Sequence, residues 1–222
     1  RAIRTSLQFT FKQDKGATDS KVIMSTSSIS GEGKTFTSIN IASVMSLSGK
    51  KTVLIGLDLR KPKIFDDFGI NNKTGIVNYL IGQAEIEEVT QFSGFENLDI
   101  ITSGPIPPNP SELLISDRMD ELIKTLKKKY DYVIIDTPPI GLVSDALNII
   151  KYVDTTLYLV RQNYTKKGML EIINEKYKQN EVKNISFVMN FFEQKAKYGY
   201  GYGYGYGYGY GYGKYGDGYI AR

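Results

Sequence analysis

The stretch STSSISGEGKTF, residues 25–36, constrains the fold of this chain more than any other segment. It follows the apolar run KVIMST and precedes a segment with helical periodicity, so it connects a predicted strand to a predicted helix. Its second half matches the end of the phosphate-loop pattern G-x-x-x-x-G-K-[ST], with Ser28 where the first glycine usually stands. A Gly-rich turn with a chance lysine would give the same letters, but the strand–loop–helix context favours nucleotide binding.

A loop of this kind can wrap the phosphates of a nucleotide with backbone N–H groups, and the N-terminus of the following helix adds partial positive charge. Lys34 would reach the β- and γ-phosphates, and the Thr35 hydroxyl would ligate Mg²⁺. The residues that we predict to contact the nucleotide run through the loop into the helix: Ser30, Gly31, Glu32, Gly33, Lys34, Thr35 and Phe36.

The rest of the chain alternates short, almost continuously apolar runs with helical patterns. Such runs are typical of a parallel sheet that is covered on both faces. We expect strands over 21–26, 51–58, 98–104, 130–139, 155–160 and 184–190, and helices over Thr35–Ser48, Gly75–Ile81, Pro110–Tyr130, Ser144–Tyr152 and Lys166–Gln179, after an opening helix. The alternation predicts an α/β fold with a doubly wound, mostly parallel sheet flanked by helices.

Two carboxylates follow predicted strands, at the edge of the sheet where ligands bind in such folds. Asp136 ends VIID and can hold Mg²⁺ directly or through water. Asp58 ends LIGLD, where it can serve as a second metal ligand or accept a proton. Each Asp alone could be a simple turn residue. Arg60 could add charge near the phosphates or pair with a surface acid, and the sequence leaves both open.

Composition excludes several chemistries. The chain has no cysteine and no histidine, which removes disulfides, thiol nucleophiles, Cys/His zinc sites and imidazole catalysis. A net charge of +4 without a Lys/Arg run does not indicate nucleic-acid binding. There is no predicted signal peptide or membrane span, and the start at Arg1 inside a helical pattern suggests a fragment of something longer.

The C-terminal segment, from residue 197 on, alternates tyrosine with glycine. Glycine provides no side chain to pack, so we expect a flexible tail after a domain that covers residues 1–196. A sticky, low-complexity segment is the plainer interpretation. As a substrate, the repeat would let any phenol enter a narrow site. The candidate phosphate acceptors are Tyr198, Tyr200, Tyr202, Tyr204, Tyr206, Tyr208, Tyr210, Tyr212, Tyr215 and Tyr219.

Four stretches in this order, together with the tyrosine cluster, resemble the bacterial tyrosine kinases of capsule and exopolysaccharide export: SSISGEGKT, LIGLDLRKP, GPIPPNPSELL and VIIDTPPIGLVSDA. The resemblance implies a phosphate-loop NTPase-like fold and transfer of phosphate from ATP, with Mg²⁺, to C-terminal tyrosines in trans. It also implies a homo-oligomeric ring, a membrane polysaccharide co-polymerase fused or separate, a tyrosine phosphatase, no nucleic acid, and a place in the cytoplasm at the inner face of the cell membrane.

The resemblance assigns roles to further residues and also contains departures. Arg1 and Arg4 correspond to the arginines of the family's E-x-x-R-x-x-R oligomerisation motif, and Asn190 resembles the asparagine that reads adenine, although a turn-forming Asn is nearly as good an interpretation. The first Asp of the family's D-x-D-x-R is Gly56 here, which leaves Asp58 as the only local proton acceptor. Ile29 stands where cell-division ATPases carry a second lysine, which argues against that group.

Three functions remain open from the sequence. The leading hypothesis is an autokinase that regulates polysaccharide polymerisation and export. The second is a phosphate-loop ATPase of assembly or positioning, with the tail as a tether. The third is a nucleotide-binding scaffold without catalysis, which the glycine at position 56 motivates.

Overall fold

The computed structural model describes residues 2–11, 20–182 and 184–193. Its centre is a sheet with the strand order β3-β4-β2-β5-β1-β6-β7, in which only the edge strand β3 is antiparallel to its neighbour. The strands are β1 (Lys21–Ser27), β2 (Thr52–Gly56), β3 (Thr90–Phe92), β4 (Leu98–Ile101), β5 (Tyr132–Asp136), β6 (Thr155–Arg161) and β7 (Ile185–Asn190). The prediction of a doubly wound, mostly parallel sheet is confirmed.

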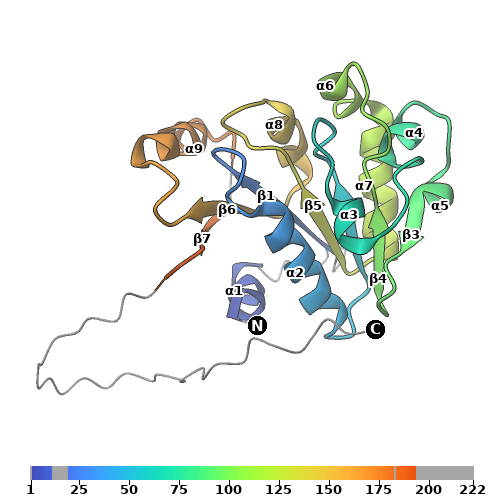
Figure 1. Cartoon of the computed structure of the whole chain (residues 1–222), viewed down its shortest axis with the longest axis horizontal. Coiled ribbons are helices and arrows are strands. Elements are labelled where there is room, and N and C mark those ends of the chain that lie inside the picture. The colour runs from blue at the N-terminus through green and yellow to red at the C-terminus, as the bar shows by residue number, and fades with distance from the viewer. Residues whose placement is uncertain (1, 12–19, 183, 194–222) are drawn as a thin grey trace, which may run out of the picture. The chain divides into compact units, whose positions relative to one another are not determined.

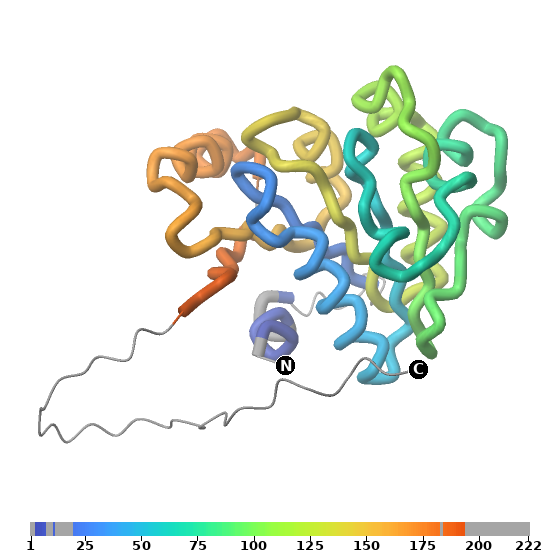
Figure 2. The backbone as a smooth tube through the Cα atoms, viewed as in Figure 1, coloured from blue at the N-terminus to red at the C-terminus, as the bar shows by residue number. Residues whose placement is uncertain are grey.

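Helices lie on both faces of this sheet, as Figures 1 and 2 show. The α-helices are α1 (Ala2–Thr10), α2 (Lys34–Ser46), α3 (Ile64–Phe68), α4 (Ile76–Leu80), α5 (Ile86–Val89), α6 (Pro110–Leu113), α7 (Asp117–Lys129), α8 (Asp145–Ile149) and α9 (Leu170–Lys178). Short 3₁₀ turns follow α8 and precede α9, at Ile150–Tyr152 and Lys167–Met169.

The buried strands supply side chains to both faces in alternation, because successive residues of a strand point in opposite directions. In β1, Val22 and Met24 pack with Leu122 and Leu126 of α7 on one face. Ile23 packs with α2 and Leu7 of α1 on the other face. The central strands are therefore buried on both sides, which explains why the sequence shows continuous apolar runs rather than a period of two.

The structure differs from the expected elements in several places. The predicted helix Pro110–Tyr130 is two helices, because Ser116 has extended backbone dihedrals and begins α7 as its N-cap residue. The short helices α3 and α5 and the antiparallel strand β3 were not predicted. In β3, two residues are half-buried and Phe92 is exposed, so the strand has no apolar pattern. None of these differences changes the sheet edge where the predicted site residues meet.

By internal contacts the chain divides after Phe192. The predicted domain boundary at residue 196 stays a prediction. The predicted phosphate-acceptor tyrosines and Arg1 lie outside the described residues. Within the described ranges, no helix has the length and apolar character needed to span a membrane.

Candidate active site

The carboxyl ends of β1, β2 and β5 are neighbours and carry the predicted site residues. The register pairs Ser25 of β1 with Asp136, and Asp136 with Gly56 of β2. The phosphate-binding loop follows β1, and the loop with Asp58 and Arg60 follows β2. Three segments that are distant in the sequence therefore converge at one edge of the sheet.

The phosphate-binding loop has the backbone conformation that its glycines permit. Gly31 and Gly33 have φ values of 84° and 92°, in the left-handed region that other residues rarely adopt. Gly33 precedes Lys34, the first residue of α2, so the helix N-terminus points into the loop. The loop is thus shaped to present N–H groups to an anion.

Lys34 and Asp136 are buried within this site. Lys34 is 8% exposed and its Nζ donates to Ser27 Oγ at 3.2 Å. Burial lowers the pKa of Lys34, while the charges of Asp136 and Asp58 act in the opposite direction. The two carboxylates therefore lie within electrostatic reach of the ammonium group, as expected for one shared site.

Asp136 is the last residue of β5 and accepts two hydroxyl hydrogen bonds. Thr35 Oγ1 donates to its Oδ2 at 2.7 Å and Ser38 Oγ donates to its Oδ1 at 3.3 Å. Burial raises the pKa of Asp136 to about 7, and the Thr35 hydrogen bond and the charge of Lys34 offset only part of that effect. A hydroxyl and a carboxylate in contact are the oxygen donors that Mg²⁺ prefers.

These two oxygen donors fit a Mg²⁺ ion that shares its remaining positions with phosphate oxygens and water. No cluster of three acidic side chains that could hold a metal alone occurs in the described part of the chain. A phosphate-loop site does not need one, since the nucleotide itself supplies ligands.

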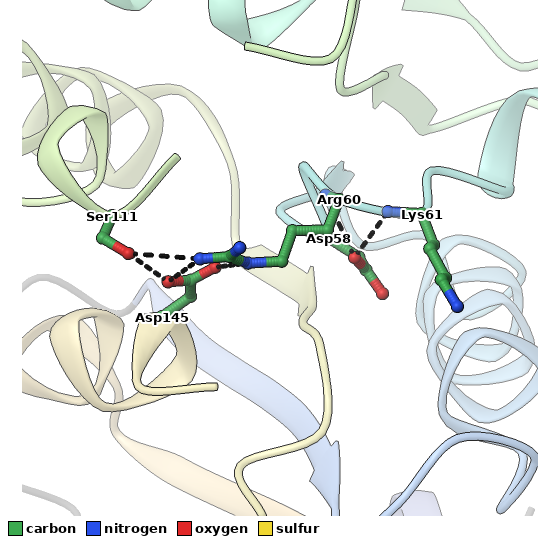
Figure 3. Close-up of polar contacts among 5 residues, drawn as sticks. All are labelled: Asp58, Arg60, Lys61, Ser111 and Asp145. Carbon is green, nitrogen blue, oxygen red and sulfur yellow. Dashed lines mark hydrogen bonds and ion pairs between the residues drawn. The ribbon is translucent and has the colours of Figure 1, made fainter. Parts of the chain in front are cut away.

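Asp58 and Arg60 lie in the turn after β2 (Figure 3). Asp58 Oδ1 accepts from the backbone N–H groups of Arg60 and Lys61 at 3.3 and 3.0 Å, and the second carboxylate oxygen points away from the turn. Asp58 is therefore held as an Asx-type turn residue, as the plainer interpretation of the sequence suggested.

Arg60 pairs with an acid, but with a buried one. Its Nε donates to Asp145 Oδ2 at 2.7 Å and its Nη2 to Asp145 Oδ1 at 3.2 Å, while Ser111 Oγ donates to the same Oδ1 at 2.6 Å (Figure 3). Burial would raise the pKa of Asp145, yet the hydrogen bonds from Arg60 and Ser111 hold it below its usual value. Of the two alternatives left open for Arg60, pairing with an acid is the one observed, but the acid is buried rather than on the surface, because Asp145 is 1% exposed.

Gly56 is closely surrounded by its neighbours, so little space is left for a side chain at this position. A Cβ at this position would lie 3.1 Å from Ser103 Oγ and 3.3 Å from Ile64 Cδ1. Ser103 Oγ also donates to the Gly56 carbonyl at 2.8 Å. A longer acidic side chain would have to displace both neighbours.

The carbonyl side of the phosphate-binding loop is held by three side chains from β6, β7 and the loop after β6. Tyr164 Oη donates to the Ser30 carbonyl at 3.1 Å and Arg161 Nη1 to the Gly31 carbonyl at 2.9 Å. Asn190 Nδ2 donates to the Glu32 carbonyl at 3.0 Å. These three side chains thus donate hydrogen bonds to three consecutive carbonyls of the loop.

The Glu32 side chain braces the same loop from within. It is fully buried, and its carboxylate accepts from the Ile29 N–H at 2.8 Å and from the Thr165 hydroxyl. Glu32 was predicted to contact the nucleotide. Its side chain is turned into the protein, so only its backbone is available for that contact.

Asn190 and Phe36 border a pocket of about 360 Å³ that extends along α2 from Phe36 to Met45, between α1 and the end of β7. The pocket is mainly apolar and is also lined by Ile3 and Arg4 of α1. The Asn190 amide faces the phosphate-binding loop, and its Oδ1 accepts from the Phe191 N–H at 2.9 Å. Reading of adenine by Asn190 therefore stays a prediction.

Five residues around the site were not predicted from the sequence: Asp145, Ser111, Arg161, Tyr164 and Thr165. Asp145 lies inside the quoted stretch VSDA but was given no role. Arg161 ends β6 and the segment QNYT follows it, so the rule that ligands bind beyond strand ends pointed to this segment as well.

The fold and the site together define a phosphate-loop nucleotide-binding domain. Residues 20–189 match the family described as the AAA domain. This match covers the sheet from β1 almost to the end of β7.

More specific relatives identify the family within this class. A putative tyrosine-protein kinase in the cps region of Klebsiella pneumoniae is 37% identical over 201 residues, which is 90% of this chain and 27% of that protein. The tyrosine-protein kinase YwqD of Bacillus subtilis is 37% identical over 190 residues, 86% of this chain and 78% of that protein.

Among solved structures, the kinase domain of the Escherichia coli tyrosine kinase ETK matches with a TM-score of 0.82 and 36% identity, over 93% of this chain and 79% of that one. The chain belongs to the bacterial tyrosine kinase family. It spans only 27% of the length of the Klebsiella relative.

Proposed function

We propose that this chain is an ATP-dependent protein-tyrosine kinase that phosphorylates the C-terminal tyrosines of neighbouring copies. The observation that carries this proposal is the contact between Thr35 and Asp136 beside the buried Lys34. It supports a site for a triphosphate with Mg²⁺, and membership of the tyrosine kinase family supports the phenol as acceptor.

In the proposed reaction each residue has a distinct task. The loop N–H groups and Lys34 hold the phosphates and stabilise charge on the transferred group. Thr35 and Asp136 would hold Mg²⁺, which supplies charge neutralisation when bound. The tyrosine oxygen attacks the γ-phosphorus, the bond to the β–γ bridging oxygen breaks, and the free Asp58 oxygen receives the phenolic proton.

The nucleotide base is proposed to lie in the pocket between α1, α2 and the end of β7, at the end that Phe36 and Asn190 line. Phe36 and Asn190 line this pocket, and its apolar walls suit a flat aromatic ring. The Asn190 amide also donates to the Glu32 carbonyl. Contact between Asn190 and adenine would therefore couple binding of the base to the conformation of the phosphate-binding loop.

Assembly and regulation follow as part of the same proposal. Copies form a ring through the N-terminal segment with Arg1 and Arg4, and an unmodified tail docks in the neighbouring site. Each phosphotyrosine adds about 1.5 to 2 negative charges, so the phosphorylated tails repel each other and leave. The ring works at the inner face of the membrane with a polysaccharide co-polymerase, and a tyrosine phosphatase resets it.

Intact mass after incubation with Mg-ATP tests the function. We expect added phosphate on the tail peptides of the unmodified chain, and none on the Lys34→Met variant. A variant with all ten tail tyrosines changed to Phe should accept no phosphate on its tail peptides yet bind nucleotide normally. Release of ADP without a mass change would contradict the kinase and indicate an ATPase. An unchanged assembly size after phosphorylation would dispose of the tail switch.

A further inference from the structure

Tyr164 lies against the phosphate-binding loop and is open to solvent at the same time. Its side chain is 43% exposed, and its hydroxyl donates to the Ser30 carbonyl at 3.1 Å. Of the described tyrosines, only Tyr177, at 57%, is also among the exposed large side chains. An enzyme that modifies exposed phenols therefore has access to a residue in contact with its own nucleotide site.

The Tyr164 hydroxyl lies against the backbone of the phosphate-binding loop. It donates to the Ser30 carbonyl at 3.1 Å, and a Cβ added to Gly31 would lie 3.2 Å from its oxygen. A phosphate on that oxygen would remove the donated proton and bring anionic oxygens against the Ser30 carbonyl. We therefore expect the modified ring to move away from the loop.

Arg161 would respond to the same modification. Its guanidinium lies 4.7 Å from the centre of the Tyr164 ring and 4.1 Å from that of Phe191, while Nη1 donates to the Gly31 carbonyl at 2.9 Å. A phosphate dianion is a stronger acceptor for guanidinium than a neutral carbonyl. Capture of Arg161 by phosphotyrosine would remove the second of the three hydrogen bonds that hold the loop.

We propose that Tyr164 is an inhibitory phosphorylation site, whose modification releases the carbonyl side of the phosphate-binding loop and weakens nucleotide binding. The phosphate comes from the kinase activity proposed above. Tyr164 contacts the carbonyl side of the loop, whereas the nucleotide faces the N–H side, so a second copy of the chain acts as the enzyme. Its ATP γ-phosphorus forms a bond to Tyr164 Oη, the bond to the β–γ bridging oxygen breaks, ADP departs, and the phenolic proton passes to a carboxylate.

The first experiment uses the full chain with its ten tail tyrosines changed to Phe, incubated with wild-type chain and Mg-ATP. We expect one phosphate on the peptide that contains Tyr164, and its loss in the same chain with Tyr164→Phe but not with Tyr177→Phe. The modified fraction should bind Mg-ADP at least about tenfold more weakly than the unmodified fraction, as loss of two loop contacts implies. Phosphate on wild-type tails without any on Tyr164, or on Tyr164 without loss of affinity, would overturn the inference and leave the kinase function intact.

A second experiment does not depend on kinase activity. In the otherwise unmodified chain, Tyr164→Phe keeps the ring over Arg161 and loses one hydrogen bond, so Mg-ADP affinity should fall only about two- to tenfold. Tyr164→Glu also places a carboxylate beside Arg161 and the Ser30 carbonyl, and should weaken binding by about a further tenfold. Equal affinities of the two variants would contradict release of the loop by negative charge, even if no tyrosine of the chain were phosphorylated.

Discussion

Arg60 and Asp145 form a two-point ion pair across 85 residues of sequence, with Nε–Oδ2 and Nη2–Oδ1 distances of 2.7 and 3.2 Å. The two partners differ in exposure, since the Arg60 side chain is 42% exposed and that of Asp145 is 1% exposed. The pair ties the turn that carries Asp58 to the start of α8. Ser111 adds the segment with α6 to the same contact.

The difference in exposure predicts unequal effects of removing either partner. Arg60→Ala leaves a buried carboxylate without its cation and should lower the free energy of unfolding by about 1–3 kcal/mol, discounted for the exposure of Arg60. Asp145→Asn leaves a neutral amide beside Arg60, whose exposed guanidinium can turn to solvent. This variant should therefore lower the free energy of unfolding by less than Arg60→Ala. Urea denaturation measures both. The matched control is Lys151→Ala, which removes a surface pair with Asp120 and should change little; equal losses for Arg60→Ala and Asp145→Asn would contradict the argument.

The raised pKa of Asp136 predicts that stability and nucleotide binding change with pH in opposite directions. Because its pKa is raised to about 7 from an ordinary value of 3.8, the folded chain keeps a proton between these values that the unfolded chain has lost. The contribution of Asp136 to stability is therefore fully present below pH 4 and is lost as the pH rises to about 7. Binding of Mg-nucleotide needs the carboxylate and should strengthen over the upper part of this window.

Asp136→Asn removes both dependences, since the amide does not titrate. Unfolding by urea and calorimetric Mg-ADP binding, each from pH 5 to about 8, measure them against wild type. We expect the variant to bind Mg-ADP weakly at every pH. A variant whose binding still rises with pH as steeply as that of wild type would assign the titration to another group.

The surroundings of Gly33 predict that an alanine at this position would clash with Asn190. This clash can be separated from backbone strain by a second substitution. A Cβ at Gly33 would lie 2.0 Å from Asn190 Nδ2, and the residue has a φ of 92°. Gly33→Ala should therefore weaken Mg-ADP binding by at least about tenfold, since Asn190 must leave the Glu32 carbonyl. Gly49→Ala is the control, with a φ of 78° and no atom within 4 Å. It should cost about 1 kcal/mol in stability and leave binding unchanged.

Asn190→Ala in the Gly33→Ala background completes this test. Removing the amide relieves the clash but not the strain at position 33, so part of the lost affinity should return. If the double variant binds no better than Gly33→Ala, strain alone explains the defect. Titration with Mg-ADP compares four chains: wild type, Gly33→Ala, Gly49→Ala and the double variant.

The close contacts of Gly56 predict that a side chain at this position would lower the stability of the protein. Gly56→Ala brings a Cβ to 3.1 Å from Ser103 Oγ and should cost about 1–3 kcal/mol in stability. Gly56→Asp should cost more, because its carboxylate would be buried beside Asp136, the register partner of position 56. Thermal unfolding and phosphate transfer check both variants. Faster transfer by Gly56→Asp at unchanged stability would show that the space is available.

The parts of the site that are local in sequence could be predicted. The glycines, Lys34 and Thr35 lie within one loop, and Asp136 ends an apolar run, so pattern and spacing suffice. The central strands were found for the same reason. The division of the predicted helix Pro110–Tyr130 also had a local signal, since Ser116 followed by Asp117 is typical of a helix start.

The contacts between distant segments could not be predicted from one sequence. The partner of Arg60 lies 85 residues away and that of Tyr164 lies 134 residues away, and neither position carries a spacing rule. Glu32 looked like one more loop residue, yet its side chain is buried beneath the loop. Such contacts depend on how loops from different strands meet at the sheet edge.

The crowding around position 56 has a consequence for attempts to redesign this site. A Cβ at this position meets Ser103 Oγ and Ile64 Cδ1 at 3.1 and 3.3 Å, so a longer side chain needs adjustments at both neighbours. Ser103 also donates to the Gly56 carbonyl, so replacing Ser103 to make space would remove a hydrogen bond at the end of β2. A second carboxylate on this strand is therefore best introduced together with changes at its neighbours.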